Sequence, residues 1–301
     1  MEAALAVARL LQFAAAMVLL GTPAFALGVA LRCPDFAAAE PAFGRWVRRA
    51  SLVAALVSLA SAALWLDLEA AAMGDAWSEA LNRDTVGAVL FDTVFGRVWL
   101  WHLGLEAALI VCLLALRGTG ALGLIVALAA AHVASLAWAG HGVMRPGATL
   151  LAVLSLHLLA GGLWLGSLPA LFHLLTRARA APSAARDRAV RIMLPLYSRV
   201  GYGVVSLLVL TGIANSVYLV ASARLLFGTA YGRVLILKLV LVTATIAVAL
   251  SNRIVLAPRI AGGHGAPVAA LARRVALEQA LALLILAAVS VLGLLPPALQ
   301  Q

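Results

Sequence analysis

The 301-residue sequence predicts an all-α polytopic membrane protein with about eight transmembrane helices, and three observations lead to this prediction. Hydrophobic residues make up 64% of the chain and charged residues only 11%, less than half the charged share of a soluble domain. The mean hydropathy is +1.07, and the apolar residues fall in runs of roughly 20, enough for a helix to cross the hydrocarbon core. The short alternating segments of a transmembrane β-barrel are absent from the sequence.

The apolar runs place eight spans near 5–31, 50–72, 97–116, 119–140, 149–176, 196–222, 233–254 and 274–296. The first run ends in Pro23-Ala24-Phe25-Ala26, which is similar to a signal-peptide cleavage site. A signal peptide should open with a basic segment, whereas this chain opens Met1-Glu2-Ala3 and has its first arginine at position 9. We therefore expect the first run to be a membrane helix.

Arginine residues in the loops predict the orientation of the chain. The positive-inside rule assigns arginine-rich loops to the cytoplasm, and this also explains the net charge of +10 without nucleic-acid binding. Both termini are then expected in the periplasm. The even-numbered loops hold only Arg83, Arg145 and Arg224 clear of the span ends. The odd-numbered loops hold Arg32, Arg45, Arg48, Arg49, Arg117, Arg177, Arg179, Arg186, Arg188, Arg191, Arg253, Arg259, Arg273 and Arg274.

The second loop is acidic and faces the periplasm in this orientation. Such a loop is either a solvated segment or a region that gathers cations at an entrance. It carries six of the twelve acidic residues of the chain, namely Asp67, Glu69, Asp75, Glu79, Asp84 and Asp92.

An internal repeat indicates two halves of similar structure. Residues 90–105 and 226–241 are identical at eight of sixteen positions, and the first span also aligns with the fifth. Four spans per unit is an even number, so the two halves share one orientation in the membrane. The sequence therefore predicts two tandem parallel four-helix repeats, 1–148 and 149–301, within a single membrane domain.

Ionisable side chains inside the predicted spans are the first candidates for function, because burying them in hydrocarbon is costly. His102 lies about two turns into the third span, and Glu106 follows at i+4 on the same helix face. His132 lies near the middle of the fourth span. His141 lies at the outer end of that span and is followed by Met144.

Two residues of other spans reach a similar depth. His157 lies about 12 Å into the fifth span, and Met17 lies in the first. Imidazole and thioether ligands together suit copper, and methionine favours Cu(I). At each position the competing interpretation is an interhelical hydrogen bond or simple packing. The predicted metal ligands, in the outer half of the membrane, are His141, His157, His102, His132, Met144 and Met17.

Three more residues are expected to support or gate the site without binding the metal. Glu106 is a suitable hydrogen-bond partner for a ligating histidine, and Gln12 aligns with His157 in the repeat. Lys238 takes the place of His102 in the second half, where it either repels a second metal or extends toward the outer face. The predicted site is therefore asymmetric and belongs mainly to the first half.

At these residues the chain resembles the copper-resistance protein D (CopD/PcoD) family of bacterial inner-membrane proteins. The resemblance covers nearly the whole chain and is strongest from 135 to 255. It rests on several short stretches that are weak singly and specific together. These are Ala139-Gly140-His141, Leu156 to Gly166 in the fifth span, Tyr197-Ser198-Arg199-Val200, Leu210-Thr211-Gly212, Thr229 to Lys238, and Ser251-Asn252-Arg253.

The resemblance implies a protein that carries periplasmic copper, as Cu(I) or Cu(II), across the inner membrane with a separate CopC-type copper-binding partner. The sequence has no P-loop, so ATP-driven pumping by this chain alone is not expected, and we expect no enzyme activity. The alternative is a b-type haem electron carrier in which two of His102, His132 and His157 are axial ligands. The sequence does not predict the oligomeric state.

Overall fold

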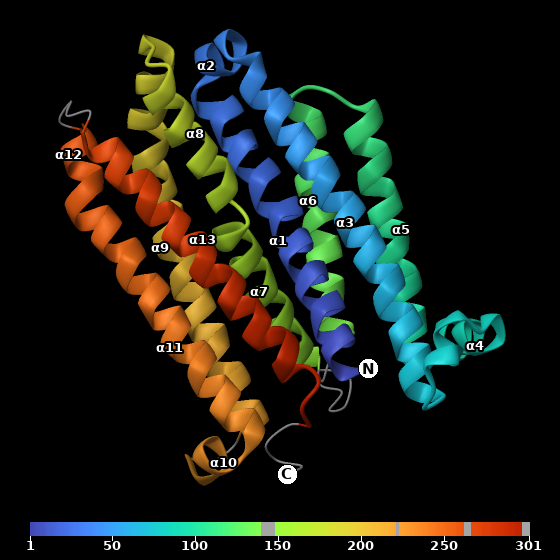
Figure 1. The fold of residues 1–301 in the computed structure, drawn as a ribbon. Coiled ribbons are helices and arrows are strands. Elements are labelled where there is room, and N and C mark those ends of the chain that lie inside the picture. The colour runs from blue at the N-terminus through green and yellow to red at the C-terminus, as the bar shows by residue number, and fades with distance from the viewer. Residues whose placement is uncertain (140–147, 221–222, 262–265, 297–301) are drawn as a thin grey trace.

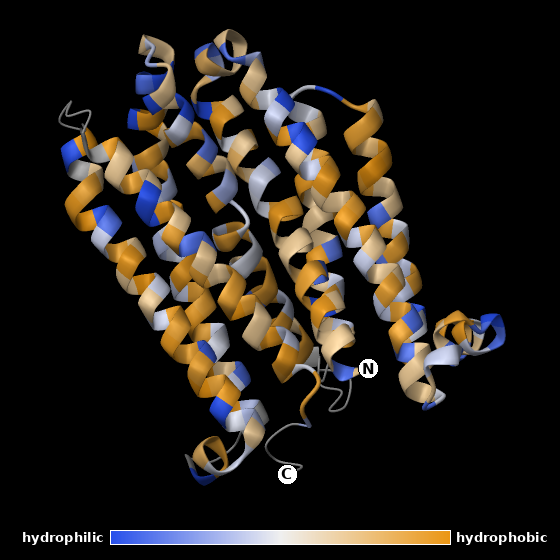
Figure 2. Ribbon diagram, viewed as in Figure 1, coloured by the Kyte–Doolittle hydropathy of each residue, from blue (hydrophilic) through white to orange (hydrophobic). Residues whose placement is uncertain are grey.

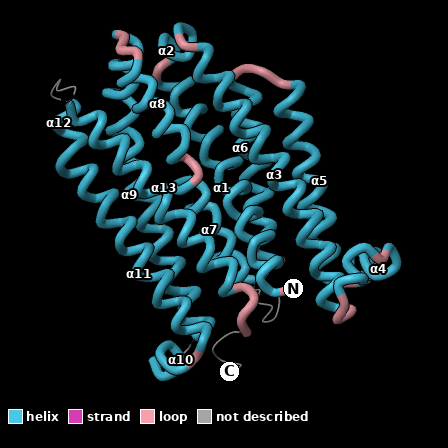
Figure 3. Tube along the Cα trace, viewed as in Figure 1, coloured by secondary structure: helices cyan, strands magenta, loops and turns pink. Residues whose placement is uncertain are grey.

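The computed structural model describes residues 1–139, 148–220, 223–261 and 266–296, and its regular elements there are all helical (Figure 3). Eight segments in these ranges are long and apolar enough to cross a membrane, which confirms the predicted number. They cover Glu2–Arg32, Pro41–Met73, Val94–Ala115, Thr119–Trp138, Thr149–Ala180, Ala184–Tyr218, Ala230–Leu256 and Val268–Leu292.

The helices lie side by side in one bundle, with α1 (Glu2–Arg32) in contact with helices of both halves of the chain (Figure 1). Apolar residues cover the middle of the bundle, and hydrophilic residues gather toward its two ends (Figure 2). The other helices are α2 (Pro34–Ala39), α3 (Pro41–Met73), α4 (Arg83–Asp92), α5 (Val94–Ala115), α6 (Thr119–Ser135), α7 (Ala148–Leu165), α8 (Leu168–Ala180), α9 (Ala184–Val220), α10 (Ala223–Gly228), α11 (Ala230–Ser251), α12 (Ala257–Ala261) and α13 (Ala266–Leu292).

The start of α1 and the end of α13 lie at the same end of the bundle, together with α4 and α10 (Figure 1). The short helices α2 and α12 lie at the opposite end. This arrangement is what an even number of crossings requires. Which end faces the periplasm stays a prediction from the arginine pattern.

Three helices begin well before the predicted spans, and one of them is α13, which begins at Ala266 where residue 274 was predicted. The second span was predicted from residue 50, but α3 begins at Pro41. The sixth was predicted from residue 196, but α9 begins at Ala184. The hydropathy pattern marks only the part of a helix inside hydrocarbon, whereas hydrogen bonding carries the helix on into the polar region. Proline at the first turn of α3 also suits a helix start.

The fifth span is interrupted in the middle, which the sequence analysis did not predict. Helix α7 ends at Leu165 and α8 begins at Leu168, with Pro169 in the first turn of α8. Proline has no amide hydrogen to donate and disfavours a helical conformation in the residue before it. The span therefore consists of two helices joined by Gly166 and Ser167.

Glycines bring α1 and α7 into direct backbone contact at this interruption. A methyl group added at Gly166 would overlap the carbonyl oxygen of Met17, and one at Gly21 would overlap the backbone at Gly166 and Ser167. The Thr22 hydroxyl donates a hydrogen bond to the Gly166 carbonyl at 3.0 Å. The helix that approaches Gly166 this closely is therefore α1.

Two hydrophobic clusters fill the bundle at different depths along the helices. One contains Leu20 of α1 and the core of α3, α5 and α6. The other contains Phe25 of α1, Leu168 of α8 and the ends of α9 and α13. Their boundary lies near Pro23, which stands inside α1, and beside the interruption of the fifth span.

The two repeated turns have the same local structure. Thr93 and Thr229 cap α5 and α11, and their hydroxyl oxygens accept hydrogen bonds from the amides of Gly96 and Gly232 at 2.9 and 3.0 Å. The short helices α4 and α10 come directly before these caps. The wider organisation into two tandem repeats stays a prediction.

Candidate metal site

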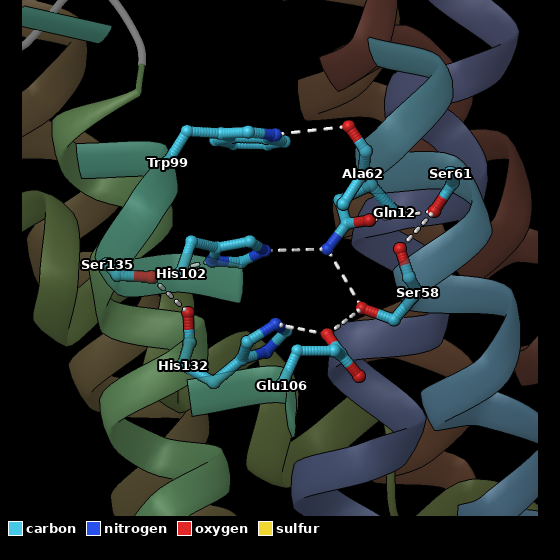
Figure 4. A network of polar contacts seen from close by, with 9 residues as sticks. All are labelled: Gln12, Ser58, Ser61, Ala62, Trp99, His102, Glu106, His132 and Ser135. Carbon is cyan, nitrogen blue, oxygen red and sulfur yellow. Dashed lines mark hydrogen bonds and ion pairs between the residues drawn. The ribbon is translucent and has the colours of Figure 1, made fainter. Parts of the chain in front are cut away.

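Three ionisable side chains of α5 and α6 meet in the interior of the bundle. His102 and Glu106 lie one turn apart on α5, and His132 lies on α6. The exposed fractions of these residues are 1%, 0% and 0%. One potential metal-binding atom from each lies within 4.8 Å of the others, which makes this the metal-compatible group within the described ranges (Figure 4). The i to i+4 spacing placed His102 and Glu106 on one face, as predicted.

Hydrogen bonds fix the protonation pattern of His102. The Ser61 hydroxyl donates to Gln12 Oε1 at 2.7 Å, so Gln12 Nε2 is the donor toward His102 Nε2, 2.8 Å away. His102 therefore carries its proton on Nδ1 and donates it to Ser135 Oγ at 2.7 Å. Ser135 in turn donates to the carbonyl of His132 at 2.7 Å. The lone pair of His102 Nε2 is thus occupied by Gln12.

The carboxylate of Glu106 receives one hydroxyl. Ser58 Oγ accepts from Gln12 Nε2 at 2.9 Å and donates to Glu106 Oε2 at 2.6 Å. Helix α1 supplies Gln12 and α3 supplies Ser58. Four helices therefore converge on the cluster, so its geometry depends on the packing of the whole first half of the chain.

Three atoms of the cluster have no hydrogen-bond partner. His132 Nε2 lies 2.6 Å from Glu106 Oε2, but off the direction along which the ring N–H could donate, and His132 Nδ1 and Glu106 Oε1 have no partner at all. No lysine or arginine of the described chain pairs with Glu106. Each buried atom left without a partner costs about 1–3 kcal/mol. His102, His132 and Glu106 would hold a cation through nitrogen and oxygen donors, and its charge would balance that of the carboxylate.

Aromatic rings form a column above the site. Phe95, Trp99 and His102 stack at centroid distances of 4.9 and 4.7 Å, and His102 stacks on His132 at 4.0 Å. The indole N–H of Trp99 donates to the Ala62 carbonyl at 3.0 Å. The column holds both imidazoles in fixed orientations, which is what a preorganised site requires.

The remaining predicted residues lie elsewhere. His157 of α7 lies beside a separate cavity, and Met17 and Lys238 line the same cavity. His157 donates or accepts at Nδ1 with Thr211 Oγ1, 3.0 Å away, and has no contact with His102, Glu106 or His132 among the described contacts. His141 and Met144 lie outside the residues that the structure describes.

Sequence reasoning missed the hydroxyl groups of the site. Ser58, Ser61 and Ser135 link the imidazoles, the amide and the carboxylate. Serine is common inside membrane helices, where its hydroxyl can bond the preceding turn. A single serine therefore gives no signal. The only sequence signal for these hydroxyl groups was the i to i+3 spacing of Ser58 and Ser61, which lie on the face of α3 that meets Gln12.

Comparison with known proteins gives a consistent result over most of the chain. Residues 1–151 match the family model described as copper resistance protein D-like, N-terminal domain. Residues 191–292 match the model described as copper resistance protein D. Both matches agree with the resemblance noted in the sequence.

Two relatives are similar over more than four fifths of their length. Copper resistance protein D of Pseudomonas syringae pv. tomato is 30% identical over 259 residues, which cover 82% of this chain and 83% of the relative. Inner membrane protein YebZ of Escherichia coli (strain K12) is 29% identical over 249 residues, which cover 81% of this chain and 83% of the relative. No solved structure matches the chain.

Proposed function

Because the chain belongs to the copper resistance protein D family, we propose that it binds copper at His102, Glu106 and His132 and moves it across the inner membrane. The membrane assignment follows the eight apolar segments and the name of the Escherichia coli relative. Copper is the cargo of this protein. We propose a transporter and not an enzyme.

The observation that carries this proposal is the buried carboxylate of Glu106 beside two imidazoles. An ionised carboxylate inside a membrane protein needs a counter-charge. The ion-pair partner of Glu106 is His132, which carries a charge only when protonated, and no lysine or arginine of the described chain pairs with Glu106. The unpartnered atoms Glu106 Oε1 and His132 Nδ1 are both possible ligand atoms. A bound cation supplies a permanent counter-charge together with the missing contacts.

The donor set indicates which copper ion the site prefers. Two imidazoles and one carboxylate offer nitrogen and oxygen, which suit Cu(II), whereas thioethers select Cu(I). Met17 lines the separate cavity of His157 and therefore does not supply a sulfur ligand here. We propose that copper occupies the site as Cu(II). His141 and Met144 remain candidates for an outer entry site.

The route into the site begins at the periplasm in this proposal. The acidic second loop gathers cations, and a separate CopC-type protein delivers the metal. Gln12 then has to leave His102 Nε2 before that nitrogen can bind the ion, because its amide occupies the lone pair. Gln12 therefore acts as a gate in this mechanism.

The haem alternative is less well supported at this pair of histidines. The rings of His102 and His132 stack face to face with centroids 4.0 Å apart. Axial ligands lie on opposite sides of a porphyrin, and stacked rings leave no slot for the macrocycle between them. A visible spectrum of the purified protein checks this directly, since bound haem gives a Soret band.

Copper content of the purified chain tests the proposed site. We expect about one Cu(II) per chain in wild type, because three donors surround one position, and most of that copper to be lost in His132→Ala and in Glu106→Gln. Glu106→Gln keeps an acceptor for the Ser58 hydroxyl, so it tests the charge without emptying the site. Metal analysis after loading and desalting gives the stoichiometry.

His173→Ala is the matched control, because His173 stacks on Trp46 at a centroid distance of 4.1 Å, away from the cluster. It should keep wild-type copper content, as should His157→Ala. Gel filtration establishes that each variant is folded. Full copper content in folded His132→Ala and Glu106→Gln would contradict the assigned site, and unchanged copper uptake by cells carrying them would contradict the transport role.

A further inference from the structure

A cavity lies between α1, α7, α9, α11 and α13, and its lining does not include His102, Glu106 or His132. Its volume is about 510 Å³, within the range of ligand-binding cavities. Along α11 it extends from Tyr231 to Ile246, about 22 Å along the helix axis. Leucine, valine, isoleucine and glycine make up most of its wall. The cavity is therefore long and apolar, a shape that suits a hydrocarbon chain.

Two positively charged side chains line this apolar cavity. Lys238, the single lysine of the chain, lines the cavity, and Arg9 lines it near the end of α13. None of the described lining residues is acidic, and Lys238 makes no ion pair with any described residue. A cation without a counter-charge is costly inside a membrane protein. An anionic ligand would remove this cost.

Arg9 and Asn215 offer further polar contacts. Arg9 Nη1 donates to the Gly293 carbonyl at 2.9 Å, and the guanidinium lies 4.7 Å from the centre of the Trp65 ring. Its Nε has no partner, and neither has Asn215 Oδ1, although both atoms are buried. Both residues line the cavity. A ligand with a polar head group therefore finds unsatisfied groups of two helices in the lining of this cavity.

His157 presents a hydrogen-bond acceptor to the same space. The Thr211 hydroxyl donates to the Leu207 carbonyl at 2.6 Å, so its oxygen accepts the Nδ1 proton of His157 at 3.0 Å. Nε2 of His157 is then unprotonated. It can accept a hydroxyl or a protonated oxygen of a head group. Lys238 and His157 together provide a donor and an acceptor.

We propose that this cavity binds an anionic amphipathic lipid, with its acidic head group at Lys238 and its hydrocarbon chain along the apolar wall. The head group is a phosphate or a carboxylate, since both present anionic oxygens to an ammonium group. This lipid site does not include His102, Glu106 or His132. The proposal therefore does not depend on whether the chain transports copper.

Lipid binding to the purified full chain tests this proposal. The probes are a phosphatidylglycerol, a phosphatidylcholine with the same acyl chains, and oleate, each with brominated chains that quench tryptophan. Trp164 lines the cavity, and Trp164→Phe identifies its share of the quenching. We expect the anionic probes to bind at least about tenfold more tightly than phosphatidylcholine, since charge-assisted contacts contribute about 1.5–3 kcal/mol.

Lys238→Met should remove that preference, and Lys238→Arg should restore most of it. Arg233→Gln is the matched control, because Arg233 is exposed on the same helix and does not line the cavity. Binding of phosphatidylglycerol but not oleate would identify the head group as a phosphate. Binding of oleate but not phosphatidylglycerol would identify it as a carboxylate. Equal binding of the anionic lipid and phosphatidylcholine, or an unchanged preference in Lys238→Met, would overturn the proposal.

A chemical readout is also available, because Lys238 is the single lysine. An amine-reactive, membrane-permeant reagent modifies it at one peptide, which mass spectrometry resolves from the N-terminus. Bound phosphatidylglycerol should slow this modification, while phosphatidylcholine should not. Equal rates with both lipids would place the head group away from Lys238.

Discussion

At the scale of single residues, Gln12 of α1 connects the candidate metal site to α3 and α5. Its amide bonds Ser58, Ser61 and His102. Since Gln12 occupies the Nε2 lone pair of His102, a metal has to displace it. Release of this hydrogen bond costs about 0.5–1.5 kcal/mol.

Gln12→Leu should therefore raise the copper affinity of the purified protein, by a few-fold to about tenfold. The leucine is similar in size and no longer competes for His102 Nε2. Competition with a chelator of known affinity measures the change. Thr22→Val is the control, since it removes a buried hydroxyl of the same helix that bonds the Gly166 carbonyl instead. Weaker copper binding in Gln12→Leu would show that Gln12 is itself a ligand.

Part of this site could be predicted from the sequence alone. His102 and Glu106 share a helix, so their spacing alone placed them together. His132 comes from another helix, and its depth allowed but did not require contact. Helix rotation decides which side a histidine faces, and hydropathy does not report rotation in a helix that is apolar all round. For this reason His157 was predicted to share a metal site with His102, whereas in the structure it lines a cavity that His102 does not reach.

At the scale of elements, Gly21 and Gly166 bring α1 into direct backbone contact with the end of α7. Neither glycine leaves room for a methyl group. In a membrane, helices associate through such packing because lipid is as apolar as the side chains. The crossing joins the two halves of the chain.

Gly166→Ala should destabilise the fold by at least about 1–3 kcal/mol, because the added methyl group pushes α1 away from α7. Thermal unfolding in detergent measures this. Gly104→Ala is the matched control, since a methyl group there meets no atom within 4 Å, and alanine also favours the helix. Equal unfolding temperatures for the two variants would contradict the close crossing.

The sequence predicted the existence of the elements better than their limits. Eight apolar runs are long enough to identify eight spans, because hydrocarbon thickness fixes the minimum length. The interruption at Gly166 and Ser167 escaped prediction, since the run from Leu150 to Leu175 is apolar throughout apart from isolated polar residues. Pro169 was the available signal.

At the scale of the whole molecule, orientation determines which compartment meets the metal cluster first. The start of α1 and the end of α13 lie at one end of the bundle with α4 and α10 (Figure 1). The arginine pattern assigns that end to the periplasm. The prediction concerns the side of the membrane, and the fold itself is compatible with either side.

Cysteine labelling tests the orientation in intact cells. Ser78→Cys and Ala184→Cys, each in a background without Cys33 and Cys112, place single thiols at exposed positions of opposite ends. A membrane-impermeant maleimide should label Ser78→Cys directly and Ala184→Cys only after permeabilisation. The reverse pattern would show that the chain has the opposite orientation in the membrane, and the proposed direction of copper movement would then be reversed.

The helices should bend most easily at the boundary between the two hydrophobic clusters. Bending a regular helix stretches its i to i−4 hydrogen bonds, whereas a proline or an interruption has already lost some of them. Pro23 of α1 and the joint between α7 and α8 lie at one level, linked by the Thr22 to Gly166 hydrogen bond. The elastic stiffness of these two central helices is therefore lowest at that level, and tilting of one end of the bundle against the other concentrates there.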